Sequence, residues 1–126
     1  MNAVEAPLSR AGDAAVLSRA AVRAAKLMGL SQRTLADVLG ISEASASRLC
    51  GGKYLLSRER AKEWELAVLL VRLFRSLDAL WGHGEAARAW LGSENIALGA
   101  PPVALLSSVA GLVRVVTYLD NARGRL

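Results

Sequence analysis

The sequence predicts an all-α fold, and three observations support this prediction. Apolar residues recur at spacings of three and four over most of the chain, which is the periodicity of one helix face. Alanine, a strong helix former, is abundant throughout. Runs in which Val, Ile or Thr alternate with polar residues, as in half-buried strands, are absent. A length of 126 residues fits one compact domain, or two small helical units that share a core.

The expected helices follow one another along almost the whole chain. Residues 1–12 contain Pro7 and Gly12 with little periodicity, and they predict a flexible arm. The first helix is expected to begin at Asp13, a good N-cap, and to end at Gly29. The remaining helices are expected over residues 31–39, 42–50, 57–81, 85–91, 103–107 and 108–121.

Serine and glycine residues mark the ends of several of these helices. Ser31 and Ser42 each stand directly before a helical segment, where a serine hydroxyl accepts a hydrogen bond from a free backbone amide. Gly40 follows the last apolar position of the second helix and is expected to adopt a left-handed conformation. Ser57 is expected to cap the fourth helix.

The fourth helix has apolar residues around most of its circumference. Leucines recur in steps of four, three, four and three from Leu66 to Leu80, and a second apolar stripe includes Trp64 and Phe74. A helix with this pattern is buried on more than one side. We expect it to be the central helix of the core, and a dimer interface on the same helix remains open.

The composition excludes several classes of protein. Hydrophobic residues make up 53% of the chain and the mean hydropathy is +0.31, as expected for a chain that folds. Cys50 is the only cysteine and His83 the only histidine, so a disulfide framework and a Cys/His metal cluster are both excluded. No pair of nucleophile and base is visible. The chain is therefore expected not to be an enzyme, and to carry no catalytic residue, metal or cofactor.

Neither a membrane span nor a secretory signal is predicted. The longest uninterrupted apolar run, Leu66–Val71, is far shorter than the roughly 20 residues that span a bilayer. The N-terminus contains the acid Glu5 and lacks the basic segment and apolar block of a signal peptide. We therefore expect a cytoplasmic location.

The positive charge is concentrated in the first half of the chain. The formal net charge is +5, and residues 1–60 hold nine Lys and Arg against five Asp and Glu. A basic half of this kind indicates an anionic partner such as nucleic acid, or it is an ordinary solvated basic face.

Residues 32–49 form a pattern of helix, tight turn and helix. Small residues lie where two helices would cross, a glycine lies at the turn, and apolar residues face inward: Ala36, Gly40, Ile41, Ala46 and Leu49. The pattern resembles the helix-turn-helix of the Xre/Cro-like DNA-binding group, whose second helix enters the major groove. The resemblance implies DNA contacts from six residues: Arg33, Ser42, Ser45, Ser47, Arg48 and Lys53.

Two roles for this unit remain open. Arg48 is the candidate for reading a guanine edge, whereas Arg33 and Lys53 suit contacts to phosphates. The outward face is poor in such groups, however, and Glu43 on it repels phosphate. The alternative is therefore a helix-turn-helix that serves only as a scaffold, with Arg48 as a surface charge.

The second half of the chain carries a further set of motifs in a fixed order. They comprise an aromatic-glycine turn, a short helix, a glycine-ended loop, a proline and a glycine-bearing last helix: Trp81-Gly82, residues 87–91, residues 95–99, Pro102 and Gly111. This order resembles the C-terminal toxin-binding domain of the Xre/MbcA/ParS-like antitoxins, the partners of RES-domain toxins. The chain departs from the family pattern at Trp81, at Glu94, at Ala100-Pro101 and at Val103, and these departures leave the identity of the partner open.

The resemblance covers nearly the whole chain and implies a type II antitoxin. It implies an arm at 1–12, a DNA-binding unit at 13–56, and a long helix with a toxin-binding domain at 57–126. It further implies steric neutralisation of an NAD-degrading RES toxin, repression of the chain's own operon, and a homodimer within a larger complex. The implied toxin contacts are Trp90, Asn95, Arg114, Tyr118, Arg123, Arg125 and Leu126, the last three lying near the toxin's NAD cleft.

Three other functions remain open beside this one. They are a plain transcriptional regulator with a C-terminal dimerisation domain, an antitoxin that has lost DNA binding, and, least favoured, an enzyme. Packing also remains an alternative for Trp90 and Gly111, and Arg123 and Arg125 suit the negative end of a helix dipole.

Several residues of the second half have predictable local roles. Asn95 is expected to hydrogen-bond the backbone of its own turn, and Gly99 to adopt a conformation that other residues avoid. Pro102 suits the first position of a helix. Trp90 and its neighbour Leu91 are expected to face different directions, one toward the core and the other outward.

Overall fold

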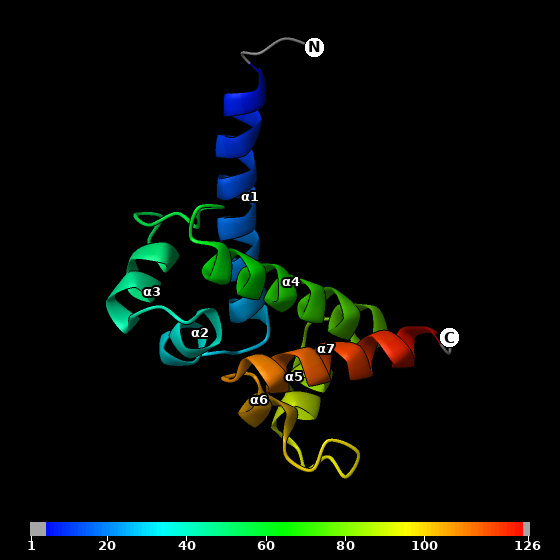
Figure 1. Cartoon of the computed structure of the whole chain (residues 1–126). Helices are drawn as coiled ribbons and strands as arrows, with labels where there is room; N and C mark the ends of the chain where they lie inside the picture. Colours follow the sequence, from blue (N-terminus) through cyan, green and yellow to red (C-terminus); the bar gives the residue numbers. More distant parts are fainter. Residues whose placement is uncertain (1–4, 125–126) are drawn as a thin grey trace.

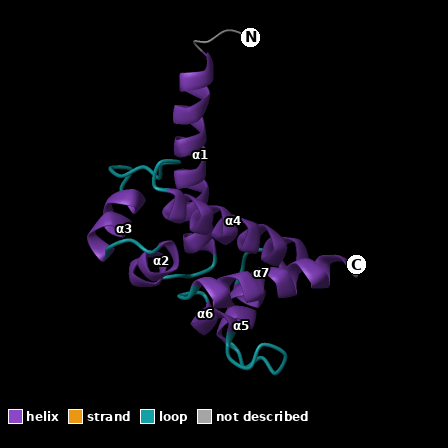
Figure 2. Cartoon of the chain, viewed as in Figure 1, coloured by secondary structure: helices purple, strands orange, loops and turns teal. Residues whose placement is uncertain are grey.

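The computed structural model describes the backbone of residues 5–124 and the side chains of residues 12–124. Within this range the chain forms seven α-helices and no strand, which confirms the all-α prediction (Figure 2). The helices are α1 (Glu5–Leu27), α2 (Gln32–Leu39), α3 (Glu43–Cys50), α4 (Ala61–Trp81), α5 (Glu85–Gly92), α6 (Pro102–Leu105) and α7 (Val109–Gly124).

Helix α4 lies at the centre of the fold. It packs against α1, α2, α5 and α7 (Figure 1). Its buried side chains include Leu66, Leu70, Leu73 and Leu77, so the leucine stripe faces the core. Packing within the chain thus covers most of the apolar surface of this helix, as expected of a central helix, although Val68 and Trp81 stay exposed.

Helix α1 begins earlier than expected. Residues 5–12, predicted as part of a flexible arm, belong to this helix, and its first half extends away from the other helices (Figure 1). Pro7 lies in the first turn, where a missing backbone N–H disrupts no helical hydrogen bond. Further along, the small buried residues Ala21, Ala24 and Ala25 let α1 approach its neighbours closely.

Helices α2 and α3 form the predicted helix-turn-helix. The Oγ of Ser31 accepts a hydrogen bond from the backbone amide of Thr34 at 3.1 Å. The Oγ of Ser42 accepts one from the amide of Ser45 at 3.0 Å. Gly40 is left-handed, with a φ of 70°, and its amide bonds back to α2. Both caps and the turn residue are confirmed.

The start of α4 differs from the prediction. Ser57 does not cap the helix, which begins at Ala61. The Ser57 oxygen accepts instead from the amide of Glu59, two residues on, at 3.3 Å. Leu56 before it is fully buried, and its amide donates to Ser18 Oγ on α1 at 3.0 Å. Because Leu56 is held by burial and by its bond to Ser18, the chain forms a turn here, and the helix begins only after that turn.

Helix α7 runs beside α4 in the same direction (Figure 1). Near their C-terminal ends a polar cluster joins them. Asp120 pairs with Arg72 and accepts a hydrogen bond from the Ser76 hydroxyl at 2.8 Å. The Ser76 oxygen in turn accepts from Arg123 at 3.1 Å. Because Ser76 is fully buried, this cluster holds the end of α7 against α4.

The junction of α6 and α7 explains a glycine inside a helix. Pro102 opens α6 at the first helical positions, as predicted. A β-carbon at Gly111 would overlap the carbonyl oxygen of Leu105, at the end of α6. Gly111 therefore permits a close approach of two helices, which is the packing alternative for this residue. Ser108 caps α7 by accepting from the Gly111 amide at 3.0 Å.

No helix in the described part of the chain has the length and apolar character to cross a bilayer.

Candidate functional site

The exposed surface of α3 is the first candidate site. We call it the α3 face, and it consists of Glu43, Ala44, Ser47 and Arg48. These side chains point outward, whereas Ala46 and Leu49 of the same helix are buried. The inward positions Ala46 and Leu49 are therefore those predicted from the sequence, whereas Ser45, which was also expected to face outward, is half-buried.

Two of the predicted DNA contacts, Ser42 and Ser45, form hydrogen bonds with each other at the start of α3. The Ser42 oxygen accepts the amide of Ser45, and the Ser42 hydroxyl donates to Ser45 Oγ at 3.0 Å. The guanidinium of Arg48 donates to the same Ser45 oxygen at 3.3 Å. Ser42 and Ser45 thus build the start of the helix and fix the position of Arg48. Arg48 does not pair with Glu43 among the ion pairs of the described residues.

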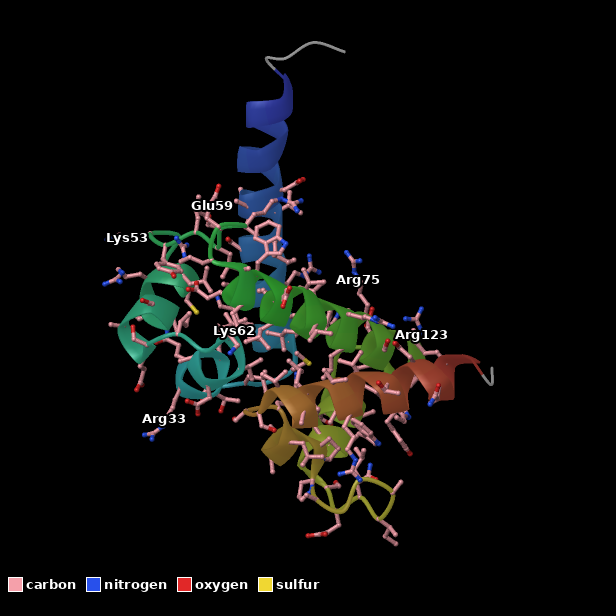
Figure 3. The ribbon with its side chains drawn as sticks, in the orientation of Figure 1. Arg33, Lys53, Glu59, Lys62, Arg75 and Arg123 are labelled. Carbon is pink, nitrogen blue, oxygen red and sulfur yellow. The ribbon has the colours of Figure 1, made fainter. Side chains whose placement is uncertain are left out.

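The remaining predicted DNA contacts flank the α3 face. Arg33 lies in the first turn of α2 and points away from the body of the protein (Figure 3). Lys53 lies in the segment between α3 and α4 (Figure 3). Both side chains and that of Ser47 are exposed. In the structure, Arg33, Ser47 and Arg48 thus lie on the helix-turn-helix, and Lys53 lies in the segment that follows it.

The segment that carries Lys53 is fixed by contacts to α4. The Tyr54 hydroxyl donates to Glu63 at 2.7 Å, and Arg60 pairs with the same carboxylate at 3.3 Å. Burial, together with the bond to Glu63, raises the pKa of Tyr54 above its ordinary value. The bond to Glu63 thus ties the residue that follows Lys53 to α4.

A stack of three aromatic rings is the centre of the second candidate site. Trp81, at the end of α4, stacks on Trp90 of α5 with ring centroids 5.2 Å apart. Trp90 stacks on Tyr118 of α7 with centroids 6.0 Å apart. Trp81 is 41% exposed, so the stack opens to solvent at one end. Leu91 is buried and Trp90 half-buried, which confirms that these neighbours face different directions.

The loop between α5 and α6 extends this surface. Asn95 Oδ1 accepts the amide of Leu98 at 3.0 Å, and Gly99 has a φ of 80°, so both predicted turn roles are confirmed. Arg114, one turn before Tyr118 on α7, donates to the carbonyl of Ala97 at 3.3 Å. Ile96 at the tip of the loop is 100% exposed.

Helix α7 connects the stack with the loop, since Tyr118 completes the stack and Arg114, one turn before it, binds the loop carbonyl of Ala97. We give the name aromatic face to the residues of this region, namely Trp81, Trp90, Ile96, Arg114 and Tyr118. The sequence-based prediction lacked Trp81 and Ile96. Trp81 was recognised only as part of a turn, and its stacking partners come from two other helices. The exposure of Ile96 could have been predicted, since an isoleucine between the turn residues Asn95 and Gly99 has little chance of reaching a core.

The C-terminal arginine lies apart from the aromatic face. Arg123 follows Arg114 by nine residues, which is two and a half helical turns, so the two lie on opposite sides of α7. Arg123 is bonded to Ser76 and borders a groove between α1 and α4. Arg125 and Leu126 lie outside the described residues. The structure therefore does not bring Arg123 together with Trp90, Asn95, Arg114 and Tyr118.

Residues that bind metals or react as acids and bases are sparse in this fold. Among the side chains of residues 12–124, no three His, Cys, Asp or Glu gather into a cluster that could hold a metal ion. His83 Nδ1 lies 2.8 Å from Asp78 in an exposed turn. Cys50 is half-buried at the end of α3.

Comparison with known protein families assigns both halves of the chain. Residues 7–72 match the antitoxin Xre-like helix-turn-helix domain. Residues 76–125 match the antitoxin Xre/MbcA/ParS C-terminal toxin-binding domain. No curated protein matches the chain. The matched ranges meet within α4, whereas the division at residues 13–56 and 57–126 stays a prediction. The first match covers more than half of the chain, and the chain therefore belongs to the Xre-like helix-turn-helix antitoxins and carries a toxin-binding domain.

Proposed function

We propose that this antitoxin neutralises a RES-type, NAD-degrading toxin through its aromatic face and represses its own operon through the helix-turn-helix. Neutralisation is steric, and this chain contributes no chemistry to it. The assignment of a toxin-binding domain to residues 76–125 establishes the class of partner. The RES identity, the cytoplasmic location and the regulation of the operon are the further steps of the proposal.

The observation that carries the proposal is the exposure of apolar and aromatic groups on the toxin-binding domain. Trp81 and the fully exposed Ile96 both belong to this domain, and Arg114 on α7 binds the loop that carries Ile96 through the Ala97 carbonyl. Aromatic residues and arginine are the groups that dominate the energy of protein interfaces. A surface of this composition fits a protein partner, whereas the α3 face with its mixed charges does not.

The two surfaces are placed so that both partners can bind at once. The helix-turn-helix packs near the first residues of α4, because Leu39 and Gly40 border the same depression as Lys62 and Glu63. Trp81 is the last residue of this 21-residue helix, about 30 Å along its axis. We infer that the toxin occupies one end of the molecule while the other end contacts DNA.

Mutation of the aromatic face tests the toxin contact. Ile96→Ala is expected to weaken toxin binding at least tenfold in Kd, because a buried aliphatic anchor contributes more than about 1.4 kcal/mol. Leu55→Ala is the matched control, since Leu55 is a similar side chain, 50% exposed, in the helix-turn-helix half. Titration calorimetry with purified toxin measures both. Equal Kd values for Ile96→Ala and the unchanged protein contradict the proposed face.

The C-terminal end is proposed to obstruct the NAD cleft of the toxin. Removal of residues 122–126 is a poor test, because it also removes the bond from Arg123 to the buried Ser76. Deletion of Arg125 and Leu126 alone leaves that bond in place. This shorter deletion is expected to reduce inhibition of NAD turnover more than tenfold with unchanged thermal stability. Full inhibition by the shortened chain rules out the obstruction.

The DNA half of the proposal is tested on the promoter of the chain's own operon. The affinity for that fragment, measured by gel shift, is expected to fall steeply as the salt concentration rises, since phosphate contacts release counterions. A two-fold symmetric dimer suits paired half-sites on such an operator. No shift at low salt favours the second candidate, an antitoxin whose helix-turn-helix is a scaffold. The engagement of Ser42 and Ser45 in capping is the observation in favour of that candidate.

A further inference from the structure

We propose that three cations on α1, namely Arg19, Arg23 and Lys26, contact DNA backbone phosphates beside the α3 face. We call them the α1 stripe. The inference rests on the proposed DNA binding and adds to it a phosphate-contacting element outside the helix-turn-helix itself.

The first observation is that the α1 stripe is exposed and unneutralised. Its members follow one another at intervals of four and three residues, so they share one face of α1. All three side chains are exposed. The Arg–carboxylate pairs of the described residues use Arg58, Arg60 and Arg72 instead. The positive charge of the α1 stripe is therefore available to an external anion.

The second observation is the position of the α1 stripe. Its three members border one groove together with residues at the end of α3 and in the segment after it: Leu49, Cys50, Gly52, Tyr54 and Leu55. Lys53 lies within that same segment. Lys26 also borders a smaller depression with Ser31 and Gln32 at the start of α2 and Ser47 of the α3 face. The α1 stripe thus continues directly into the surface that holds the predicted DNA contacts.

The third observation is that the α3 face cannot supply the electrostatic attraction alone. Its four residues include one cation, Arg48, and one acid, Glu43, so their charges cancel. Sequence-independent affinity for DNA comes from neutralised phosphates. The positive charge of the α1 stripe therefore suits a duplex backbone.

The dependence of affinity on salt tests the inference without knowledge of the operator. The probe is a random-sequence duplex, and binding is measured by fluorescence anisotropy over a range of salt concentrations. The variant Arg19→Gln/Arg23→Gln/Lys26→Gln is expected to reduce the slope of log K against log salt by about 2.7, since each phosphate contact contributes about 0.9. Glutamine preserves helix propensity, and exposed substitutions of this kind leave stability nearly unchanged.

Two single substitutions distinguish a local phosphate contact from an effect of the protein's net charge. Arg23→Gln is expected to reduce the slope by about 0.9, whereas Arg75→Gln is expected to leave it unchanged. Arg75 is also exposed and projects from α4 away from the helix-turn-helix (Figure 3). Equal effects of these two substitutions overturn the inference, because they show dependence on net charge alone.

The outcome for the unaltered protein distinguishes the two proposals. If the unaltered protein shows no salt-dependent binding to any duplex, the proposed DNA-binding function fails, and the inference fails with it. If the unaltered protein binds and the triple variant keeps the same slope, the α1 stripe is refuted while DNA binding by the helix-turn-helix survives.

Discussion

Single hydroxyl groups define the geometry of the helix-turn-helix. Ser42 satisfies a free amide at the start of α3 and orients Ser45, which in turn accepts from Arg48. A residue predicted as a DNA contact is therefore a structural cap. The sequence already predicted Ser42 as a cap. The structure adds that its hydroxyl also donates to Ser45, whose oxygen accepts from Arg48.

Removal of this cap has a predictable cost. Ser42→Ala is expected to lower the free energy of unfolding by about 1 kcal/mol, because an amide of α3 loses its partner. Ser47→Ala, one turn further along the same helix and exposed, is expected to change it by less than about 0.5 kcal/mol. Urea denaturation followed by circular dichroism measures both. Equal losses for the two variants contradict the capping role.

A glycine inside α7 is expected to be irreplaceable. Gly111→Ala is expected to cost about 2–3 kcal/mol, since the added methyl group overlaps the Leu105 carbonyl and the helices must separate. Gly92→Ala is the control, because open space surrounds Gly92 at the end of α5. The thermal midpoint is expected to fall for the first variant only. A Gly111→Ala protein of unchanged stability shows that α6 and α7 are not closely packed.

At the scale of elements, the order of the helices is predictable and several of their ends are not. Periodicity placed α2 and α3 to within a residue, because each has a serine before it and a glycine after it. The start of α4 was missed because the burial of Leu56 and its bond to Ser18 are long-range contacts that no local pattern encodes. The aromatic stack was missed for a similar reason, since its three rings come from α4, α5 and α7.

The polar cluster between α4 and α7 is expected to stabilise the end of α7. Ser76→Ala removes a buried hydroxyl that serves both Asp120 and Arg123. A loss of about 1–2 kcal/mol is expected, with faster hydrogen exchange in the last turns of α7. The exposed Ser107→Ala is the control, with no expected change in either measurement. Unchanged exchange in Ser76→Ala contradicts this role.

At the scale of the whole molecule, α4 separates two surfaces of different character. The half that contains α1 to α3 exposes uncompensated positive charge. The half that contains α5 to α7, which follows the exposed Trp81 at the end of α4, exposes Ile96, Val109 and Val113. The uneven charge of the sequence indicated the first surface. The second surface could not be predicted from the sequence, although the motifs around it indicated the family.

This separation predicts that the two activities can be lost independently. Arg48→Ala is expected to reduce the preference for operator over random DNA by tenfold or more, a loss typical of a base contact. The same variant is expected to bind toxin with unchanged Kd. Ile96→Ala is expected to show the opposite pattern. Gel shifts measure the DNA preference of both variants, and calorimetry measures their Kd for the toxin. A variant that loses both DNA preference and toxin affinity contradicts two separate surfaces.

Cellular NAD is the most direct test of the central claim, which is that this antitoxin neutralises a RES-type toxin. The toxin of its operon is expressed with and without this chain, and NAD is assayed in cell extracts together with co-purification of the two proteins. The account predicts that NAD collapses with toxin alone and returns to the toxin-free level, with a stable complex, when both are present. NAD that stays depleted, with no complex recovered, contradicts the account and favours a plain DNA-binding regulator.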